Sequence, residues 1–195
     1  MDQVLMTTTG DVDHAVAKLK MNLEFDKEYA YCAIFVLSHG HNDSGHEWIS
    51  CGRDSQFQLK STILSKLTLN DCPHMKGRPL IVVVRACRGG RANVTGQTEE
   101  FPLAGATASP LLPDSYVLYS MPEGFFDSFS ATKGSMFMEL FCKGVQEGKD
   151  IEQIAKDINK EEILRKVRDP RRGTSGSVLQ SEAGPVRLIK KFKFY

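Results

Sequence analysis

Two segments of the chain are apolar at every position, which sets them apart from the mixed segments around them. Residues 80–84 form a run of aliphatic, mostly β-branched side chains that ends in Arg85-Ala86-Cys87-Arg88-Gly89-Gly90. Residues 33–37 have the same character and end in Ser38-His39-Gly40. A strand that is covered on both faces is apolar throughout, so both segments are predicted to be strands of one parallel sheet.

Other segments place their apolar residues on one face of a helix. In the segment that begins at Asp11, these residues follow the spacing i, i+3, i+4 and i+7, with Asp11 or Thr9 as the cap. Similar patterns predict helices over residues 59–67, 136–145 and 151–158. Helices that alternate with apolar strands over 195 residues predict a single α/β domain.

The remaining segments are predicted to be a third strand, a hairpin, two loops and a closing strand. Residues 116–119 are apolar and extend the sheet, and Asn42-Asp43-Ser44-Gly45 is a turn signal between two short segments. The composition between Gly89 and Pro113, and again over residues 169–185, is small and polar, which is typical of loops. From Val186 to Tyr195 apolar and polar residues alternate, which predicts a final strand.

The two apolar strands deliver a histidine and a cysteine to the same edge of the predicted sheet. His39 follows the first strand and Cys87 follows the second, and open α/β sheets hold their chemistry at the carboxyl ends of their strands. An imidazolium lowers the pKa of a neighbouring thiol, and the thiolate attacks a carbonyl carbon. Backbone N–H groups of Gly40 and Cys87 can then stabilise the oxyanion. Taken singly, Cys87 could instead be a buried, inert thiol and His39 a hydrogen-bonded residue at a strand end.

The context of these residues resembles the caspase family. The signature of that family is Gln-Ala-Cys-Arg-Gly with a histidine about 50 residues upstream. Here Ala86-Cys87-Arg88-Gly89 follows His39, and the cysteine lies 48 positions (87 − 39) after the histidine. Tyr119-Ser120, Lys133-Gly134-Ser135 before a helix, and the closing residues 188–195 match further landmarks in the caspase order. The chain is therefore identified as a divergent member of the caspase family.

The resemblance implies a three-layer caspase-like fold, in which helices flank a mostly parallel central sheet. Residues 1–94 would correspond to the large-subunit part, residues 95–113 to the linker between subunits and residues 114–195 to the small-subunit part, all within one domain. From the resemblance, this chain is expected to lack the first strand and helix of the usual fold, so that its large-subunit part is short at the amino terminus. In caspases the final strand lies at the centre of a dimer. The segment from Val186 to Tyr195 is therefore expected to pair with a second copy or with another caspase, since an unpaired edge strand invites aggregation.

The chain departs from the family at the pocket that holds the aspartate of a caspase substrate. Caspases form this pocket from an arginine well before the histidine, a glutamine two positions before the cysteine and the arginine of a Ser-Trp-Arg strand. No arginine precedes His39, Arg85 replaces the glutamine, and Asp127-Ser128-Phe129 occupies the Ser-Trp-Arg positions. Losing one partner of a buried charged pair costs about 2–5 kcal/mol. Cleavage after aspartate is therefore expected to fall by several orders of magnitude.

Arg85, Ser128 and Phe129 are the candidate residues of this altered substrate pocket. Arg85 can turn into the pocket and restore one cation, which would give a weak or altered specificity for acidic residues. It can equally face solvent or pair with Glu99 or Glu100. The sequence leaves these alternatives open.

Composition and charge limit the partners, the cellular compartment and the cofactors that are expected for the protein. A net charge of +1 and the absence of any apolar run near the roughly 20 residues that cross a bilayer argue against a nucleic-acid or membrane partner. Five cysteines, an odd number without close pairs, fit a reducing compartment, and no signal peptide pattern opens the chain, so a cytoplasmic location is predicted. The spacing of His39, His41, His46 and Cys51 fits no common zinc site, so neither a metal nor another cofactor is expected.

Two functions of different classes are consistent with the sequence. The first is a cysteine endopeptidase acting on peptides or proteins after acidic residues, with His39 as general acid and base and Cys87 as nucleophile. The second is a catalytically impaired homologue that binds an active caspase and modulates it. The retained dyad favours the enzyme, whereas the altered pocket favours the regulator. The resemblance implies a role in apoptosis-type signalling for either.

Overall fold

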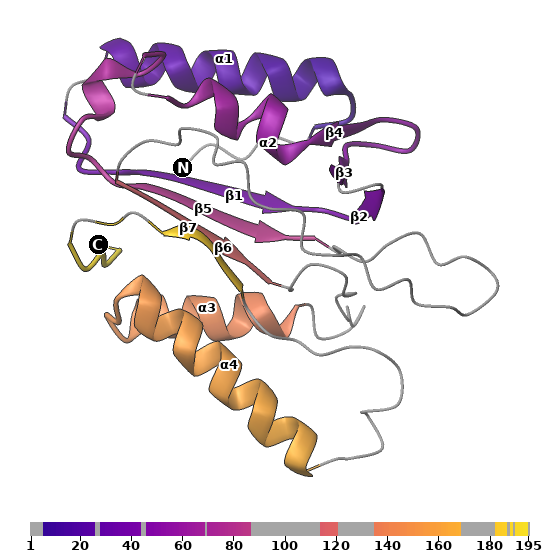
Figure 1. Ribbon diagram of the computed structural model, residues 1–195, viewed down its shortest axis with the longest axis vertical. Coiled ribbons are helices and arrows are strands. Elements are labelled where there is room, and N and C mark those ends of the chain that lie inside the picture. The colour runs from indigo at the N-terminus through magenta and orange to yellow at the C-terminus, as the bar shows by residue number, and fades with distance from the viewer. Residues whose placement is uncertain are drawn as a thin grey trace.

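Two layers of helices enclose a central sheet (Figure 1). This computed structural model describes residues 6–25, 28–43, 46–68, 70–86, 114–120, 135–168, 182–186, 188 and 190–194. Within them, the main sheet has the strand order β1-β5-β6-β7 and a small sheet has the order β2-β3-β4. The strands are β1 (Cys32–Leu37), β2 (Gly40–Asp43), β3 (His46–Ser50), β4 (Gln56–Gln58), β5 (Leu80–Arg85), β6 (Ser115–Tyr119) and β7 (Glu182–Val186). The helices are α1 (Thr9–Phe25), α2 (Leu59–Thr62), α3 (Met136–Gln146) and α4 (Ile151–Arg168).

The main sheet is mostly parallel, as the apolar runs predict. β5 pairs in parallel with β1 on one side and with β6 on the other, whereas β7 runs antiparallel to β6. β5 is buried from Leu80 to Val84 because it has strands on both sides and helices on both faces. β1 is only half-buried over residues 33–36, because it is the outermost strand of the described sheet.

Each face of the main sheet carries its own apolar core. Leu80, Val82 and Val84 pack in one core with residues of α1 and α2, and the alternate residues Ile81 and Val83 pack in the other with residues of α3 and α4. The two cores confirm a three-layer α/β fold. The same alternation directs the next side chain of β5, that of Arg85, to the α3 and α4 face.

Helix α1 begins with a reciprocal cap formed by a threonine and an aspartate. Thr8 Oγ1 accepts the N–H of Asp11 at 3.2 Å, and Asp11 Oδ2 accepts the N–H groups of Thr8 at 2.8 Å and of Thr7 at 3.0 Å. These hydrogen bonds hold the pKa of the Asp11 carboxyl below its ordinary value. The cap is therefore Thr8, and neither Thr9 nor Asp11 as the sequence predicted. Asp11 is the reciprocal partner in a capping box.

The helix predicted over residues 59–67 is divided into two pieces. After α2, a 3-10 turn covers Leu64–Lys66, and Ile63 joins them with φ −113° and ψ −62°. The apolar positions that defined the prediction are buried, namely Leu59, Ile63, Leu64 and Leu67. The sequence pattern thus identified the buried face correctly, although the backbone does not form one continuous helix. The predicted hairpin is formed by β2 and β3, and β4 joins it as a third strand that the sequence did not predict.

The last strand lies earlier in the chain than its alternating pattern predicts. β7 pairs with β6 over Glu182–Val186, a segment that was expected to be loop. The strand predicted from Val186 to Tyr195 is therefore wrong at the described residues that follow Val186. Of its remainder, residues 188 and 190–194 are described, and none of them belongs to a strand.

The alternating pattern near the carboxyl terminus reflects aromatic anchors instead of strand pairing. Phe192 and Phe194 pack edge-on against Tyr31, with ring centroids 4.9 and 5.9 Å away. The Phe192 carbonyl accepts the N–H of Ile151 at 3.0 Å, which ties the segment to the start of α4. None of the helices in the described part of the chain is both long and apolar enough to span a bilayer.

Candidate active site

The register of β1 against β5 aligns the carboxyl ends of the two apolar strands. Cys32 lies opposite Leu80 and Leu37 lies opposite Arg85, so each residue of β1 faces the residue 48 positions later (85 − 37). His39 and Cys87 are separated by the same 48 positions (87 − 39). In the sequence, His39 comes two residues after the end of β1 and Cys87 comes two residues after the end of β5. His39 is described and exposed, whereas Cys87 lies outside the described residues.

The backbone before His39 is fixed to both sheets through Ser38. The Ser38 N–H donates to the Arg85 carbonyl at 3.0 Å, which extends the parallel ladder of the main sheet. The Ser38 hydroxyl donates to the Ser50 carbonyl at 2.6 Å, and the Ser50 N–H donates to the His39 carbonyl at 2.9 Å. His39 is thus held where the two sheets meet. Sequence reasoning assigned no role to Ser38, and its only signal was its position directly before the histidine.

The backbone of Gly40 has a defined direction in the small sheet. Because Ser50 donates to His39, these two residues form a hydrogen-bonded pair of the antiparallel ladder. The next pair, Gly40 and Ile49, is then a non-hydrogen-bonded pair. The N–H of Gly40 therefore points away from β3 and is directed to the opposite side of β2.

Three of the other cysteines are unsuited to nucleophilic chemistry. Cys32, Cys51 and Cys72 are buried, and Cys142 is exposed on α3. Burial, together with the neighbouring Cys72, raises the pKa of the Cys32 thiol to about 12. Burial also raises the pKa of Cys51 and of Cys72. Since the thiolate is the reactive form, these three thiols are protonated and inert at neutral pH.

Arg85 lies at the carboxyl edge of the sheet, beside a buried serine. Its side chain is half-buried and its Nε atom is shielded from solvent, which disfavours the solvent-facing alternative. Ser120 follows β6 and donates its N–H to the Val84 carbonyl at 2.8 Å, so that it neighbours Arg85 across the ladder. The Ser120 side chain is only 1% exposed. The sequence marked Ser120 as a landmark but assigned it no place in the site.

The other predicted pocket residues, Ser128 and Phe129, lie outside the described residues, as does the linker over residues 95–113. Among the described side chains, no group of three histidine, cysteine, aspartate or glutamate residues could hold a metal ion. The described part of the site therefore consists of His39, Gly40 and Arg85, with Ser38 as their common support.

Comparisons with known proteins identify the same family that the sequence motifs resemble. The family model described as caspase domain matches residues 4–170. Caspase drICE of Drosophila melanogaster is 31% identical over 115 residues, which cover 56% of this chain and 32% of that protein. Caspase-6 of Gallus gallus is 26% identical over 160 residues, which cover 73% of this chain and 51% of that protein.

A solved structure shows the same fold. The crystal structure of caspase-1 from Spodoptera frugiperda superposes with a TM-score of 0.66 at 17% identity, over 93% of this chain and 69% of that chain. The chain spans about a third of the length of the Drosophila relative and about half of the length of the Gallus relative. Because the family model covers most of the sequence and the fold agrees with it, the chain belongs to the caspase domain family.

Proposed function

We propose that the protein is a caspase-like cysteine endopeptidase that hydrolyses peptide bonds after acidic residues, with weak or altered specificity. The observation that carries this proposal is the register of β1 against β5, whose offset equals the spacing between His39 and Cys87. Two residues at the same edge of this parallel pair would have this separation, so the equality supports a dyad of His39 and Cys87. Membership of the caspase domain family supports the same reading.

In this mechanism Cys87 is the nucleophile and His39 is the general acid and base. The Cys87 thiolate forms a bond to the carbonyl carbon of the substrate, and the carbonyl oxygen becomes an oxyanion. The N–H groups of Gly40 and Cys87 donate to that oxyanion. The Gly40 N–H is suited to this role because it points away from β3 and is not used in the small sheet. His39 then protonates the departing amine as the C–N bond breaks, which leaves a thioester. Water hydrolyses the thioester after giving a proton to His39, and the thiolate is regenerated.

Arg85 is proposed to supply the cation of the substrate pocket. It occupies the position of the family's glutamine and is half-buried at the edge to which the dyad is directed. A guanidinium binds a carboxylate with two parallel hydrogen bonds, so it favours aspartate or glutamate. Ser128 and Phe129, where caspases have tryptophan and arginine, provide no second cation. This difference accounts for the proposed weak or altered specificity.

The edge strand β7 is the proposed dimer contact. In the described sheet β7 is the last strand and pairs with β6 on one side. The contact expected from Val186 to Tyr195 therefore moves to Glu182–Val186, because Phe192 and Phe194 pack within their own chain. The partner is a second copy or another caspase. A cytoplasmic role in apoptosis-type signalling is proposed by analogy with the family.

A second function, modulation of an active caspase, is favoured by one specific observation. The position of the pocket arginine in the Ser-Trp-Arg strand is held by Phe129, which carries no charge. If Arg85 does not replace this cation, the chain would bind a caspase partner through β7 without cleaving its substrates.

The experiment that separates these functions is hydrolysis of fluorogenic peptides that differ in the residue before the scissile bond. The protein is assayed at high concentration in a phosphate or sulfate buffer, which strengthens association. Turnover after Asp or Glu that disappears in Cys87→Ala supports the endopeptidase. In Arg85→Ala this turnover should fall by a factor of about 30 or more, from the 2–5 kcal/mol cost of an unpaired buried charge. A folded dimer that hydrolyses no peptide would overturn the endopeptidase and favour the regulator.

A further inference from the structure

The small antiparallel sheet has one buried face and one outward face. Ile49 on β3 pairs with Phe57 on β4, and both side chains are buried in the core on the α1 side. Neighbouring side chains on a strand point to opposite faces. The cross-strand row that lies one residue before Ile49 along β3 therefore points outward. That row consists of His41, Trp48 and Gln58, all half-buried.

The outward face continues directly from His39. The hydrogen bond from Ser50 to His39 places these residues opposite each other, and Gln56 lies opposite Ser50. On the outward face, the row of His39, Ser50 and Gln56 is thus the next row after that of His41, Trp48 and Gln58. The row between them has its side chains on the buried face. Trp48 is the diagonal cross-strand neighbour of His39, at a typical separation of about 7–8 Å between their Cα atoms. An indole at this distance is within reach of the first residues that follow a departing amine protonated by His39.

We propose that this outward face, centred on Trp48, binds the substrate residues that follow the scissile bond. The inference rests on the proposed function, because it uses the role of His39 as the acid that protonates the departing amine. The segment attached to that amine must lie on the His39 side of the site, whereas Arg85 lies on the β5 side. The small sheet is the surface that His39 adjoins. The site therefore has two parts, one for the acyl half and one for the amine half of the substrate.

The chemistry of this face defines the peptides that it would bind. The indole of Trp48 offers a broad apolar surface with one N–H donor, and it is suited to an aromatic, aliphatic or proline side chain. His41 and Gln58 flank it on the neighbouring strands and can hydrogen-bond to a peptide backbone. The preferred substrates are thus peptides with an acidic residue before the scissile bond and an apolar residue one or two positions after it.

The first test uses Trp48 as its own probe, since it is the only tryptophan of the chain. Cys87→Ala, which cannot turn over, is titrated with two tryptophan-free peptides. One ends at the acidic residue and the other continues with two apolar residues. We expect the emission of Trp48 to shift with the longer peptide and to stay unchanged with the shorter one. The inference is overturned if neither peptide shifts the emission while calorimetry detects binding, if both peptides shift it equally, or if the longer peptide does not bind at all.

The second test compares peptides with and without residues after the scissile bond. Internally quenched peptides extend past the bond, whereas aminocoumarin peptides end there. In Trp48→Thr the ratio of kcat/KM for the extended over the truncated peptides should fall 5–30-fold, mainly through KM, and Trp48→Phe should restore part of it. His46→Thr, on the same strand and face but one row further from His39, should keep the wild-type ratio. An unchanged ratio in Trp48→Thr overturns the inference.

The two tests separate a failure of this inference from a failure of the proposed function. If the wild-type protein hydrolyses neither class of peptide, the endopeptidase is overturned, and the fluorescence titration still decides whether the face binds a peptide. If it hydrolyses both classes and Trp48→Thr affects them equally, the endopeptidase stands and the subsite does not.

Discussion

Ser38 joins the two sheets directly before His39, the residue proposed as general acid and base. Its N–H bonds to β5 and its hydroxyl bonds to β3, so the two sheets are joined at the residue before His39. A histidine that acts as general acid must be held within hydrogen-bond reach of its partner. Ser38 is therefore a positioning residue of the proposed dyad.

Ser38→Ala tests this role, because it removes the hydroxyl bond and keeps the N–H bond. We expect the free energy of unfolding to fall by about 1 kcal/mol, the usual value of one hydrogen bond. We also expect a several-fold lower kcat with little change in KM, measured by peptide hydrolysis. Ser65→Ala is the matched control, since Ser65 Oγ donates to the Ser61 carbonyl at the same 2.6 Å, far along the chain from His39. If both variants keep the wild-type kcat, Ser38 has only a structural role.

At the scale of elements, α3 and α4 are in close contact because a glycine lies between them. A Cβ added at Gly144 would meet Ile154 Cγ1 at 2.6 Å, and Ile154 is only 1% exposed. Side chains in a close-packed core have little room to move aside. Gly144 is thus required by the distance between the two helices and not by its backbone conformation.

Gly144→Ala is expected to lower the free energy of unfolding by about 1–3 kcal/mol through overpacking. This loss outweighs the gain of up to about 1 kcal/mol that alanine brings to a helix. Gly10→Ala, near the start of α1, is the control, because its Cβ would meet only Thr8 Oγ1 at an ordinary 3.6 Å. Urea unfolding should show the first variant destabilised and the second unchanged or stabilised. Equal effects would mean that the helices can separate at little cost.

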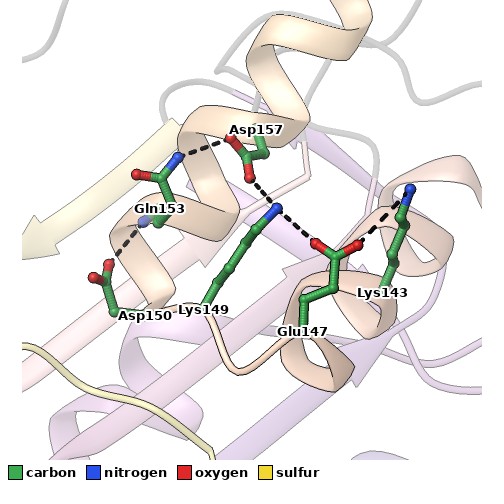
Figure 2. Close-up of polar contacts among 6 residues, drawn as sticks. All are labelled: Lys143, Glu147, Lys149, Asp150, Gln153 and Asp157. Atoms are coloured by element: carbon green, nitrogen blue, oxygen red, sulfur yellow. Dashed lines mark hydrogen bonds and ion pairs between the residues drawn. The ribbon is translucent and has the colours of Figure 1, made fainter.

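An ion-pair network joins the loop between α3 and α4 to both helices (Figure 2). Lys149 Nζ lies 2.6 Å from Glu147 Oε2 and 2.7 Å from Asp157 Oδ2. The hydrogen bonds to Asp157 and Glu147 raise the pKa of Lys149 to about 12. The hydrogen bond from Lys149 also lowers the pKa of Glu147 and of Asp157. Each carboxylate is therefore more acidic in the folded protein than in the unfolded chain.

The direction of these pKa shifts determines how the loss of thermal stability in Lys149→Met depends on pH. A carboxyl with a lowered folded pKa stabilises the protein above its unfolded pKa, and the stabilisation is lost as the pH falls through the folded pKa. The Tm difference between wild type and Lys149→Met should thus be largest near neutral pH. It should shrink as the pH falls below about 4, the ordinary range of carboxyl pKa values, and disappear only below the lowered pKa values of the two carboxyls in the folded protein.

Lys143→Met is the control for this prediction. Lys143 Nζ lies 4.0 Å from Glu147 Oε1, and the Lys143 side chain is 69% exposed, so its removal should leave Tm nearly unchanged at every pH. A Tm difference for Lys149→Met that does not depend on pH would indicate lost packing and not lost charge pairing.

At the scale of the whole molecule, the carboxyl-terminal segment completes the core beneath the sheet. Phe192 is 5% exposed and lies 4.9 Å, between ring centroids, from both Tyr31 and Phe194. Phe194 in turn packs against Phe141 of α3 at 5.7 Å. Phe192 and Phe194 are therefore joined to the residue before β1 and to helix α3 within one core.

Phe192→Ala should consequently destabilise the whole domain. We expect the free energy of unfolding to fall by about 3–5 kcal/mol, the usual cost of deleting a buried aromatic ring. Denaturant unfolding of Phe25→Ala provides the comparison, because Phe25 is 77% exposed and its loss should change little. Similar midpoints for the two variants would contradict the anchoring role of the carboxyl-terminal segment.

The sequence alone determined the elements whose patterns follow from burial. β5 was predictable because a strand enclosed on both faces must be apolar throughout, and α3 because one face of a helix must be apolar. The spacing of 48 between His39 and Cys87 was also contained in the sequence. The register of β1 against β5 has the same offset, which only the tertiary structure shows.

The tertiary structure decided the features that depend on contacts between distant residues. The alternating carboxyl-terminal segment was predicted to be a strand, because strand pairing and aromatic anchoring give the same period of two; only the contacts with Tyr31 and Ile151 distinguish them. The bond from Ser38 to Ser50 and the outward row around Trp48 likewise depend on cross-strand pairing, which a linear sequence does not specify. Local patterns fixed which side chains are buried, and long-range pairing fixed which of them meet.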